Sequence, residues 1–268
     1  MPLTVIQQEV TKALRSFRTE HDFVGGGAAL NKKWSRLSDD MDIFHDRRDR
    51  LPDSVEREIQ ALRDAGFVVE ETVESDLTVE IIAGKNNAET KVQWFYDDET
   101  CKRFFAAVQD EDFGFRLHQA DTAVNKVLCA SRRREAVRDA IDLLNIVRLY
   151  SPLGPLIWAA VGKAPSSSPI SIARGIRNIV FGYSNEELRT VSSEDDGMTT
   201  QDELRETLGP ALDGARAYCE DVAPEALSGH LFVDQNDKPI EATEEMLASG
   251  TARALPVTDF GIMPKMGE

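Results

Sequence analysis

Two aspartates stand two positions apart, at Asp40 and Asp42, in the run from Ser38 to Phe44. If this run is a β-strand, side chains two residues apart lie on the same face, so both carboxylates can reach one point in space. Carboxylate oxygens in this arrangement suit Mg²⁺, or the similar Mn²⁺, which shares its coordination between one or two carboxylates and substrate phosphates. The pair therefore predicts a metal site that acts on a phosphorylated substrate.

A glycine run, Gly25 to Gly27, precedes the aspartate pair by a short distance. It follows the short apolar stretch 22–24 and leads into residues 28–34, which have the composition of a helix. Glycines before a helix allow backbone N–H groups to approach a phosphate, and the start of a helix favours an anion. The glycines are thus expected to hold a triphosphate while the aspartates hold the metal.

A second group of charged residues lies further along the chain, at Lys126, Asp139 and Asp142. Lys126 has apolar neighbours on its predicted helix, so its stem is expected to lie along the core with the ammonium directed to an opening. Asp139 and Asp142 are three apart on a second predicted helix and share a face. They could orient Lys126, add a metal ligand or take a proton from an acceptor hydroxyl. The alternative is an ordinary set of ion pairs between two adjacent helices.

The elements that must position these residues follow from hydrophobic periodicity and turn residues. Residues 1–150 are expected to form a mixed α/β domain of the α+β type, in which helices flank a mixed sheet. The predicted helices cover 3–17, 28–34, 52–66, 99–108, 120–134 and 135–150, and the predicted strands cover 22–24, 41–45, 67–72, 77–83 and 91–96. The last two strands flank residues 84–87, which predict the turn of an antiparallel hairpin.

Residues 151–268 are expected to form a smaller, mainly helical C-terminal lobe. Helices are predicted over 156–161, 170–179, 185–191 and 201–221, followed by a small hairpin over 230–240. The tail 251–268 has little periodicity, so it is expected to be loosely ordered.

Taken together and in this order, the glycine run and the aspartate pair resemble the GG…DxD signature of the DNA-polymerase-β-like nucleotidyltransferase superfamily. With the Lys126 and Asp139 blocks added, residues 22–150 resemble the nucleotidyltransferase AbiEii/AbiGii toxin family. The resemblance implies that Gly26, Gly27 and Ser38 belong to the nucleotide site and that Asp40 and Asp42 bind the metal. It also implies that Lys126 and Asp139 belong to the catalytic motifs that follow the GG and DxD motifs along the chain.

The function that this resemblance implies is Mg²⁺-dependent transfer of an NMP from an NTP to an acceptor. RNA, and tRNA in particular, is the expected acceptor, and an antitoxin is an expected partner, because known family members act as toxins of toxin–antitoxin or phage-defence systems. In this reading, Lys126 neutralises charge on the triphosphate, and Asp139 or Asp142 positions or deprotonates the acceptor.

The pattern departs from the superfamily at one position. A third carboxylate usually completes the metal site on a neighbouring strand, but the expected position holds Gln93. An amide oxygen can bind Mg²⁺ but cannot act as a base. Glu80, on the other arm of the predicted hairpin, is a possible substitute. This departure keeps open the alternative of a catalytically weakened module that binds an NTP or a partner.

Composition narrows the class of protein further. The chain has 268 residues and a net charge of −16, so it would repel a polyphosphate at long range. RNA would need a local basic patch, for which 47–50 and 132–134 are candidates, and a small-molecule or protein acceptor stays open. The sequence predicts no membrane span and no secretory signal, which makes the cytoplasm the expected compartment. The three cysteines are far apart and predict neither disulfides nor a zinc site.

Overall fold

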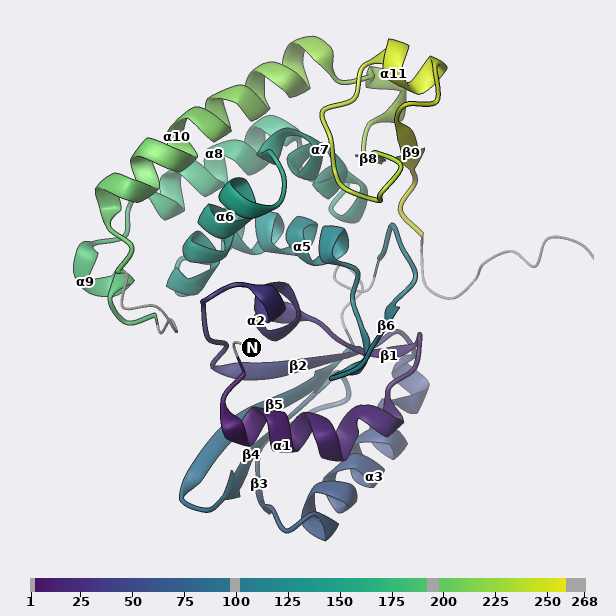
Figure 1. Ribbon diagram of the computed structural model, residues 1–268, viewed down its shortest axis with the longest axis vertical. Coiled ribbons are helices and arrows are strands. Elements are labelled where there is room, and N and C mark those ends of the chain that lie inside the picture. The colour runs from purple at the N-terminus through teal and green to yellow at the C-terminus, as the bar shows by residue number, and fades with distance from the viewer. Residues whose placement is uncertain (1–2, 97–101, 192–197, 259–268) are drawn as a thin grey trace, which may run out of the picture. The chain divides into compact units, whose positions relative to one another are not determined.

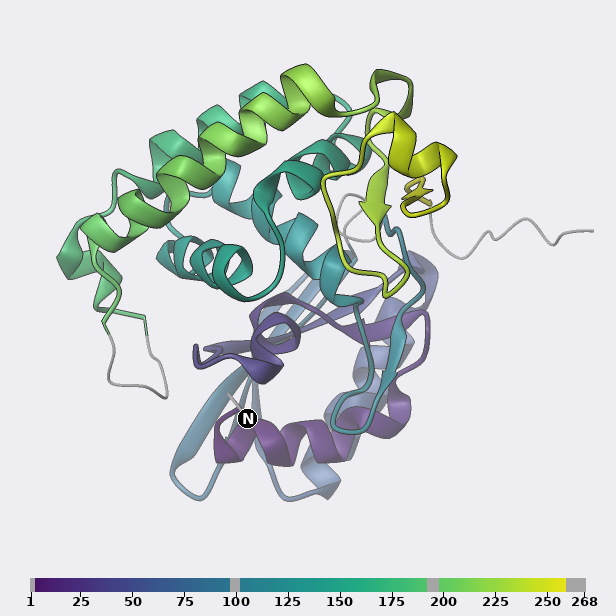
Figure 2. The same ribbon diagram turned by 45° about the horizontal axis from the view of Figure 1, so that its top comes forward.

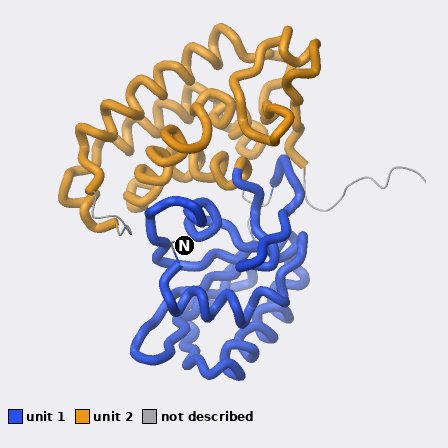
Figure 3. The backbone as a smooth tube through the Cα atoms, in the orientation of Figure 1, with its two compact units in different colours: residues 1–119, 259–268 blue, residues 120–258 orange. Residues whose placement is uncertain are grey.

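The computed structural model describes residues 3–96, 102–191 and 198–258. The contacts within the chain group the described residues up to Gln119 into one compact unit, unit 1, and Ala120–Thr258 into another, unit 2 (Figure 3). The boundary predicted from the sequence lies after residue 150 instead. The difference arises because α5 (Gln119–Arg132) and α6 (Val137–Leu149) are grouped with the helices that follow them and not with the sheet.

A mixed β-sheet forms the centre of unit 1, which confirms the expected α/β class. In the described residues it has seven strands, in the order β3-β4-β5-β2-β1-β7-β6. The β2–β5 and β1–β7 pairs are parallel, and the others are antiparallel. The strands are β1 (Asp22–Val24), β2 (Asp40–His45), β3 (Val68–Glu74), β4 (Thr78–Lys85), β5 (Ala88–Phe95), β6 (Val108–Asp110) and β7 (Gly114–Arg116).

Two helices, α1 (Val5–Leu14) and α3 (Leu51–Asp64), lie together against one face of this sheet (Figure 1). The first begins at a capping box in which Thr4 and Gln7 satisfy each other's backbone N–H groups, and the second has a proline in its first turn. Their apolar stripes enter one core with the inward residues of the central strands, among them Met41, Ile43, Val92 and Trp94. The core therefore takes alternate residues of β2 and β5 and leaves the residues between them on the other face.

Unit 2 is mainly helical, as the sequence predicts for most of it. Helix α10 packs against α6, α7 and α8, and Figure 2 shows it running across them. A short antiparallel pair, β8 with β9, completes the unit. The remaining elements are α7 (Leu153–Lys163), α8 (Pro169–Val180), α9 (Asn185–Leu188), α10 (Gln201–Ala217), β8 (Leu231–Val233), α11 (Glu244–Ala248) and β9 (Arg253–Leu255). None of the described helices in either unit has the length and apolar character needed to cross a membrane.

Three local predictions need correction or completion. The helix predicted over 99–108 is wrong in its described part, because residues 102–107 are not helical and Val108 begins β6; residues 99–101 lie outside the described residues. The partner strand of β8 is β9, from the segment expected to be loosely ordered, while Pro239 adds only an isolated bridge. The five-residue α2 (Gly26–Leu30) begins at the glycines themselves and is shorter than predicted.

Candidate functional site

In unit 1, the glycine run and the aspartate pair are brought together by the pairing of β1 with β2. The strands are antiparallel, with Val24 opposite Ile43, so the chain leaving β1 turns at Gly25 beside Asp42. The Gly25 N–H donates to the Asp42 carbonyl oxygen at 2.9 Å. Gly26 has φ +59°, and a Cβ built on it would lie 1.8 Å from Asp42 Oδ2. The carboxylate of Asp42 therefore packs directly against a position where only glycine fits.

Gly27 is constrained by a second pair of polar side chains. A Cβ on Gly27 would lie 2.3 Å from Arg36 Nη2 and 3.0 Å from Ser38 Oγ. The buried Ser38 hydroxyl donates to the Asp40 carbonyl oxygen at 3.0 Å. Arg36 is not among the predicted site residues, but it is 1% exposed and its Nη1 donates to the Leu37 carbonyl oxygen. An arginine placed between a glycine run and an aspartate pair is the signal that could have found it.

Gln7 of α1 ties the loop before β2 to the rest of the sheet. Its Nε2 donates to the Ser38 carbonyl oxygen at 2.8 Å and to Thr90 Oγ1 at 3.3 Å, while its Oε1 accepts the Thr4 N–H. The side chain is buried, so these hydrogen bonds are made without competition from water. The same residue thus caps α1 and fixes the backbone from which Ser38 and Asp40 extend.

Across the sheet, Asp42 begins a row of polar residues on the face opposite the apolar core. Its register partner on β5 is Gln93, whose own partner on β4 is Glu80. Gln93 Nε2 donates to Glu80 Oε2 at 2.7 Å. The amide oxygen of Gln93 is therefore the atom left to bind a cation. Asp40, which is buried, has Lys91 as its partner on β5.

Both carboxylate oxygens of Glu80 already contact neighbouring side chains. Its Oε1 accepts from the Thr72 hydroxyl at 2.8 Å, and its Oε2 lies 3.4 Å from Lys91 Nζ as well as accepting from Gln93. It also stands two strands from Asp42, which is about 10 Å between backbones at the usual strand spacing. Glu80 thus serves better as the partner that orients Gln93 than as a third ligand.

The oxygen atoms of this part of the sheet that are of a type to bind a cation are the Asp40 and Asp42 carboxylates and the Gln93 amide oxygen. All are hard oxygen donors, and they fit Mg²⁺ or Mn²⁺ in a site that also uses phosphate oxygens. Within the residues that the structure describes, no group of three or more His, Cys, Asp or Glu side chains could hold a metal ion. The short α2 has little macrodipole, so phosphates here would meet individual N–H groups and side chains.

The second charged group forms a closed cluster inside unit 2. Lys126 Nζ, on α5, lies 2.8 Å from both Asp139 Oδ1 and Asp142 Oδ2, on α6. All three residues are buried. Asp139 Oδ2 is buried too, and it has no hydrogen-bond partner among the described residues. These contacts fit both the expectation that the aspartates orient Lys126 and the alternative of ordinary ion pairs between two adjacent helices. Asp139 Oδ2 is the oxygen that can accept a further proton.

A second buried charge pair lies on another face of α5, and the sequence analysis does not anticipate it. Lys163 Nζ, on α7, lies 2.8 Å from Asp121 Oδ1 and donates to Asn125 Oδ1 at 2.8 Å. Lys163 and Asp121 are both 0% exposed. The i, i+4 spacing of Asp121 and Asn125 on α5 was the available signal. The two clusters together fix α5 against α6 and α7.

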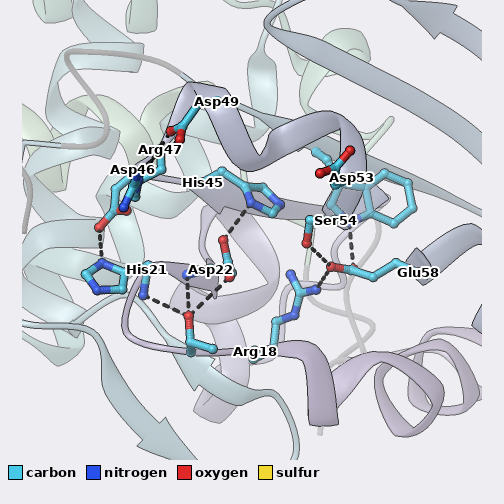
Figure 4. A network of polar contacts seen from close by, with 12 residues as sticks. Arg18, His21, Asp22, His45, Asp46, Arg47, Asp49, Asp53, Ser54 and Glu58 are labelled. Carbon is cyan, nitrogen blue, oxygen red and sulfur yellow. Dashed lines mark hydrogen bonds and ion pairs between the residues drawn. The ribbon is translucent and has the colours of Figure 1, made fainter. Parts of the chain in front are cut away.

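A further network of polar contacts surrounds the other end of β2 (Figure 4). His45 Nδ1 lies 2.6 Å from Asp22 Oδ1, and His21 Nδ1 lies 2.9 Å from Asp46 Oδ2. Burial alone would raise the pKa of Asp22, but the hydrogen bond and charge of His45 hold the pKa below its usual value. The His45–Asp22 pair joins β2 to β1, and the His21–Asp46 pair joins the residues just outside these strands, so both anchor the strands away from Asp40 and Asp42.

Within the described residues, three of the six arginines in the basic segments expected to form an RNA-binding rim lie beside acids of the same unit. Arg47 lies 2.9 Å from Asp49, and Arg48 lies 3.3 Å from Asp76. In unit 2, Arg134 lies 2.9 Å from Glu187. These exposed pairs reduce the local positive charge that a nucleic acid would meet.

Cys129 and Cys219 form no disulfide within the described residues, and Cys101 lies outside them. Burial raises the pKa of the Cys219 thiol to about 12. Cys219 is therefore protonated near neutral pH and is no candidate nucleophile.

No family model, curated protein or solved structure matches the chain. Its function is inferred below from the geometry of the described residues and from the sequence motifs.

Proposed function

We propose that this protein is a nucleotidyltransferase that moves an NMP from an NTP to an acceptor and depends on Mg²⁺ or Mn²⁺. The observation that carries the proposal is the packing of Asp42 against Gly26. It places the second aspartate of a DxD strand directly beside a glycine turn at which no side chain fits. The backbone N–H groups that can bind phosphate thus lie next to the carboxylates that can bind a metal ion, and both belong to unit 1. Transfer from a triphosphate requires this proximity.

Each residue of the proposed site has a defined task. Asp40, Asp42 and the Gln93 amide oxygen hold the divalent cation, which when bound stabilises negative charge on the phosphates. The N–H groups of Gly26 and Gly27 bind phosphate oxygens and orient the chain of phosphates. The Ser38 hydroxyl, which donates to the Asp40 carbonyl oxygen, turns its proton to a phosphate oxygen when the NTP binds.

The family resemblance alone assigns the acid–base and charge-neutralising tasks to the unit 2 residues Lys126, Asp139 and Asp142. Lys126, held by Asp139 and Asp142, supplies the cation for the departing pyrophosphate. Asp139 Oδ2 accepts the proton of the acceptor hydroxyl. The hydroxyl oxygen forms a bond to the α-phosphorus, while the bond from the α-phosphorus to the oxygen that bridges to the β-phosphate breaks and pyrophosphate leaves. Support for joining the two groups in one reaction comes from their order in the sequence, which resembles that of the AbiEii/AbiGii toxins.

The test is transfer of label from each α-³²P NTP to total cellular RNA, with Mg²⁺ and with EDTA. Asp42→Asn should lower the rate by about 100-fold or more, since it weakens binding of the cation that stabilises the reacting phosphates. Asp39→Asn is the matched control, because Asp39 is an exposed aspartate of the same run, and it should stay close to the wild type. Full turnover by a folded Asp42→Asn variant would refute the assignment.

A second candidate is a module that binds an NTP without transferring it. The observation in its favour is Gln93, which stands where a third carboxylate is usual and donates to Glu80. Calorimetry and the transfer assay together distinguish the two candidates. For the binding module, calorimetry should show Mg²⁺-dependent NTP binding that Asp42→Asn abolishes, and the transfer assay should show no label on RNA, protein or a small amine.

The acceptor class follows from the same assay. RNA and tRNA are the acceptors that the family resemblance implies, and an antitoxin is the partner. The net charge of −16 and the paired arginines favour a cationic small molecule or a protein instead. Label in an RNA band would decide for RNA, and label on added protein or amine would decide for the alternative.

A further inference from the structure

A groove of about 860 Å³ lies between α3 and β3 in unit 1, on the face of the sheet that carries the apolar core. Its floor is apolar and consists of Leu51, Val55 and Ile59 of α3 and Val79 of β4. All four are buried, with exposures from 1% to 8%. The floor residues therefore belong to the core and expose only a small part of their side chains in the groove.

The pairing of β3 explains why no apolar side chains of this strand fill the groove. Glu71 and Glu74 are the register partners of Ile81 and Val79, whose side chains enter the core. Because paired residues of antiparallel strands point to the same face, both glutamates point toward the α3 side, where the rest of the sheet has apolar residues. A register shift between Glu71 and Val73 breaks the alternation of the strand. β3 therefore contributes an acidic wall where a core-facing strand would contribute an apolar one.

Negative charge prevails along both walls. Arg57 and Arg63 also line the groove, but Arg63 lies 3.4 Å from Glu71, and Arg57 Nε donates to the Asp53 carbonyl oxygen. The carboxylates of the walls outnumber these two arginines; they are Asp53, Glu56, Glu71, Glu74 and Asp76.

An exposed apolar residue adjoins the groove. Leu77 is 42% exposed and follows Asp76 in the turn between β3 and β4, where Ser75 and Asp76 line the groove. β3 is also an edge strand of the sheet. Apolar surface that is exposed beside a charged wall is typical of a surface that another chain covers.

We propose that the α3–β3 groove is the docking site of a basic, amphipathic segment of a partner protein. Apolar side chains of that segment would fill the floor over Val55, Ile59 and Val79. Its lysines or arginines would meet the acidic walls, whose charge selects cations and repels phosphate-bearing ligands. The groove is lined by α3 from Leu51 to Arg63, which is about 18 Å at the rise of a helix and matches five or six extended residues.

The test uses the intact protein and a fluorescein-labelled synthetic peptide in which lysine alternates with leucine. Glu56→Gln/Glu74→Gln removes one charge from each wall at exposed positions and should weaken binding by about tenfold in fluorescence anisotropy. The control is Glu206→Gln/Glu225→Gln, which removes two exposed glutamates of unit 2 and should leave the affinity within about twofold. In methyl NMR spectra, the peptide should shift Val55, Ile59 and Val79.

Several outcomes would overturn the proposal. Equal weakening in both double variants would reduce the binding to general attraction by an acidic protein. If the peptide does not bind, or if it binds without shifting the methyl signals of the floor residues, the groove is not the docking site of a basic amphipathic segment. Concentration-dependent dimerisation that Glu56→Gln/Glu74→Gln abolishes would assign the groove to a second copy of the chain. None of these outcomes depends on transfer of a nucleotide.

Discussion

At the scale of single residues, Gly26 carries a tight steric constraint. Its φ of +59° lies in the left-handed region, and the space for a Cβ is taken by the Asp42 carboxylate. Either feature alone disfavours a side chain, and together they link the conformation of the turn to the position of a proposed metal ligand.

Gly26→Ala should therefore affect stability and activity together. We expect a loss of about 1–3 kcal/mol in the free energy of unfolding, from strain at positive φ and displacement of Asp42. NMP transfer should fall by about 100-fold or more, and urea unfolding followed by circular dichroism gives the stability.

Gly214→Ala is the matched control for this substitution. Gly214 lies in α10 with nothing within 4 Å of the added Cβ, so alanine should stabilise the helix by about 0.5–1 kcal/mol. Wild-type stability and transfer in Gly26→Ala would contradict the packing described for Asp42.

At the scale of elements, α5 is held by buried charges on two of its faces. The Lys163–Asp121 pair is fully buried, and removal of one partner would leave the other charged in a site without water.

Lys163→Met should lower the free energy of unfolding by about 3–5 kcal/mol, while Asp121→Leu/Lys163→Met should recover most of that loss. The double variant should then be folded, and chemical labelling of Lys126 detected by mass spectrometry reports whether α5 has rotated. If the single and double variants are equally unstable, the loss is one of packing and not of charge pairing.

The short β6–β7 hairpin depends on one carboxylate. Asp110 accepts hydrogen bonds from Lys32 Nζ at 2.6 Å and from the N–H groups of Asp112 and Phe113 in the turn. Burial alone would raise the pKa of Asp110, but these hydrogen bonds, with one from Arg116, hold the pKa below its usual value.

Because the folded-state pKa of Asp110 is lowered, its contribution is present above the unfolded pKa of about 3.8 and is lost as the pH falls through the folded value. Asp110→Asn should cost about 1 kcal/mol at pH 7. The difference from the wild type should shrink in unfolding curves measured below about pH 4. A difference that is constant from pH 7 to pH 3 would show that the carboxylate charge is not responsible.

At the scale of the whole molecule, the excess of acidic residues is the dominant electrostatic property. A net charge of −16 produces self-repulsion that favours the unfolded chain, and salt screens repulsion between exposed charges over roughly 8–10 Å.

The melting temperature at pH 7 should therefore rise by a few degrees between about 0.02 and 0.3 M NaCl. Calorimetry at several salt concentrations measures this shift. A fall in melting temperature with salt would mean that exposed ion pairs such as Arg47–Asp49 and Arg134–Glu187 outweigh the net repulsion.

The sequence by itself determined the helices and strands that have a clear hydrophobic period. It also determined which side chains share a face of such an element. The 3.6-residue stripe of α1, the proline and glycine that bound α3, and the alternation of β2 are local signals, and the structure confirms these elements. The same local spacing placed Asp40 and Asp42 on one strand face and Asp139 and Asp142 on one helix face, because both repeats are properties of the backbone.

Only the tertiary structure decided which residues from different elements meet. The neighbours of Asp42 across the sheet, Gln93 and Glu80, depend on the register of three strands, which no single strand encodes. Lys163 and Asp121 lie on separate helices, and only packing makes their charges a pair. The three-residue strands β6 and β7 are too short to show a period, so long-range pairing, not local preference, makes them strands.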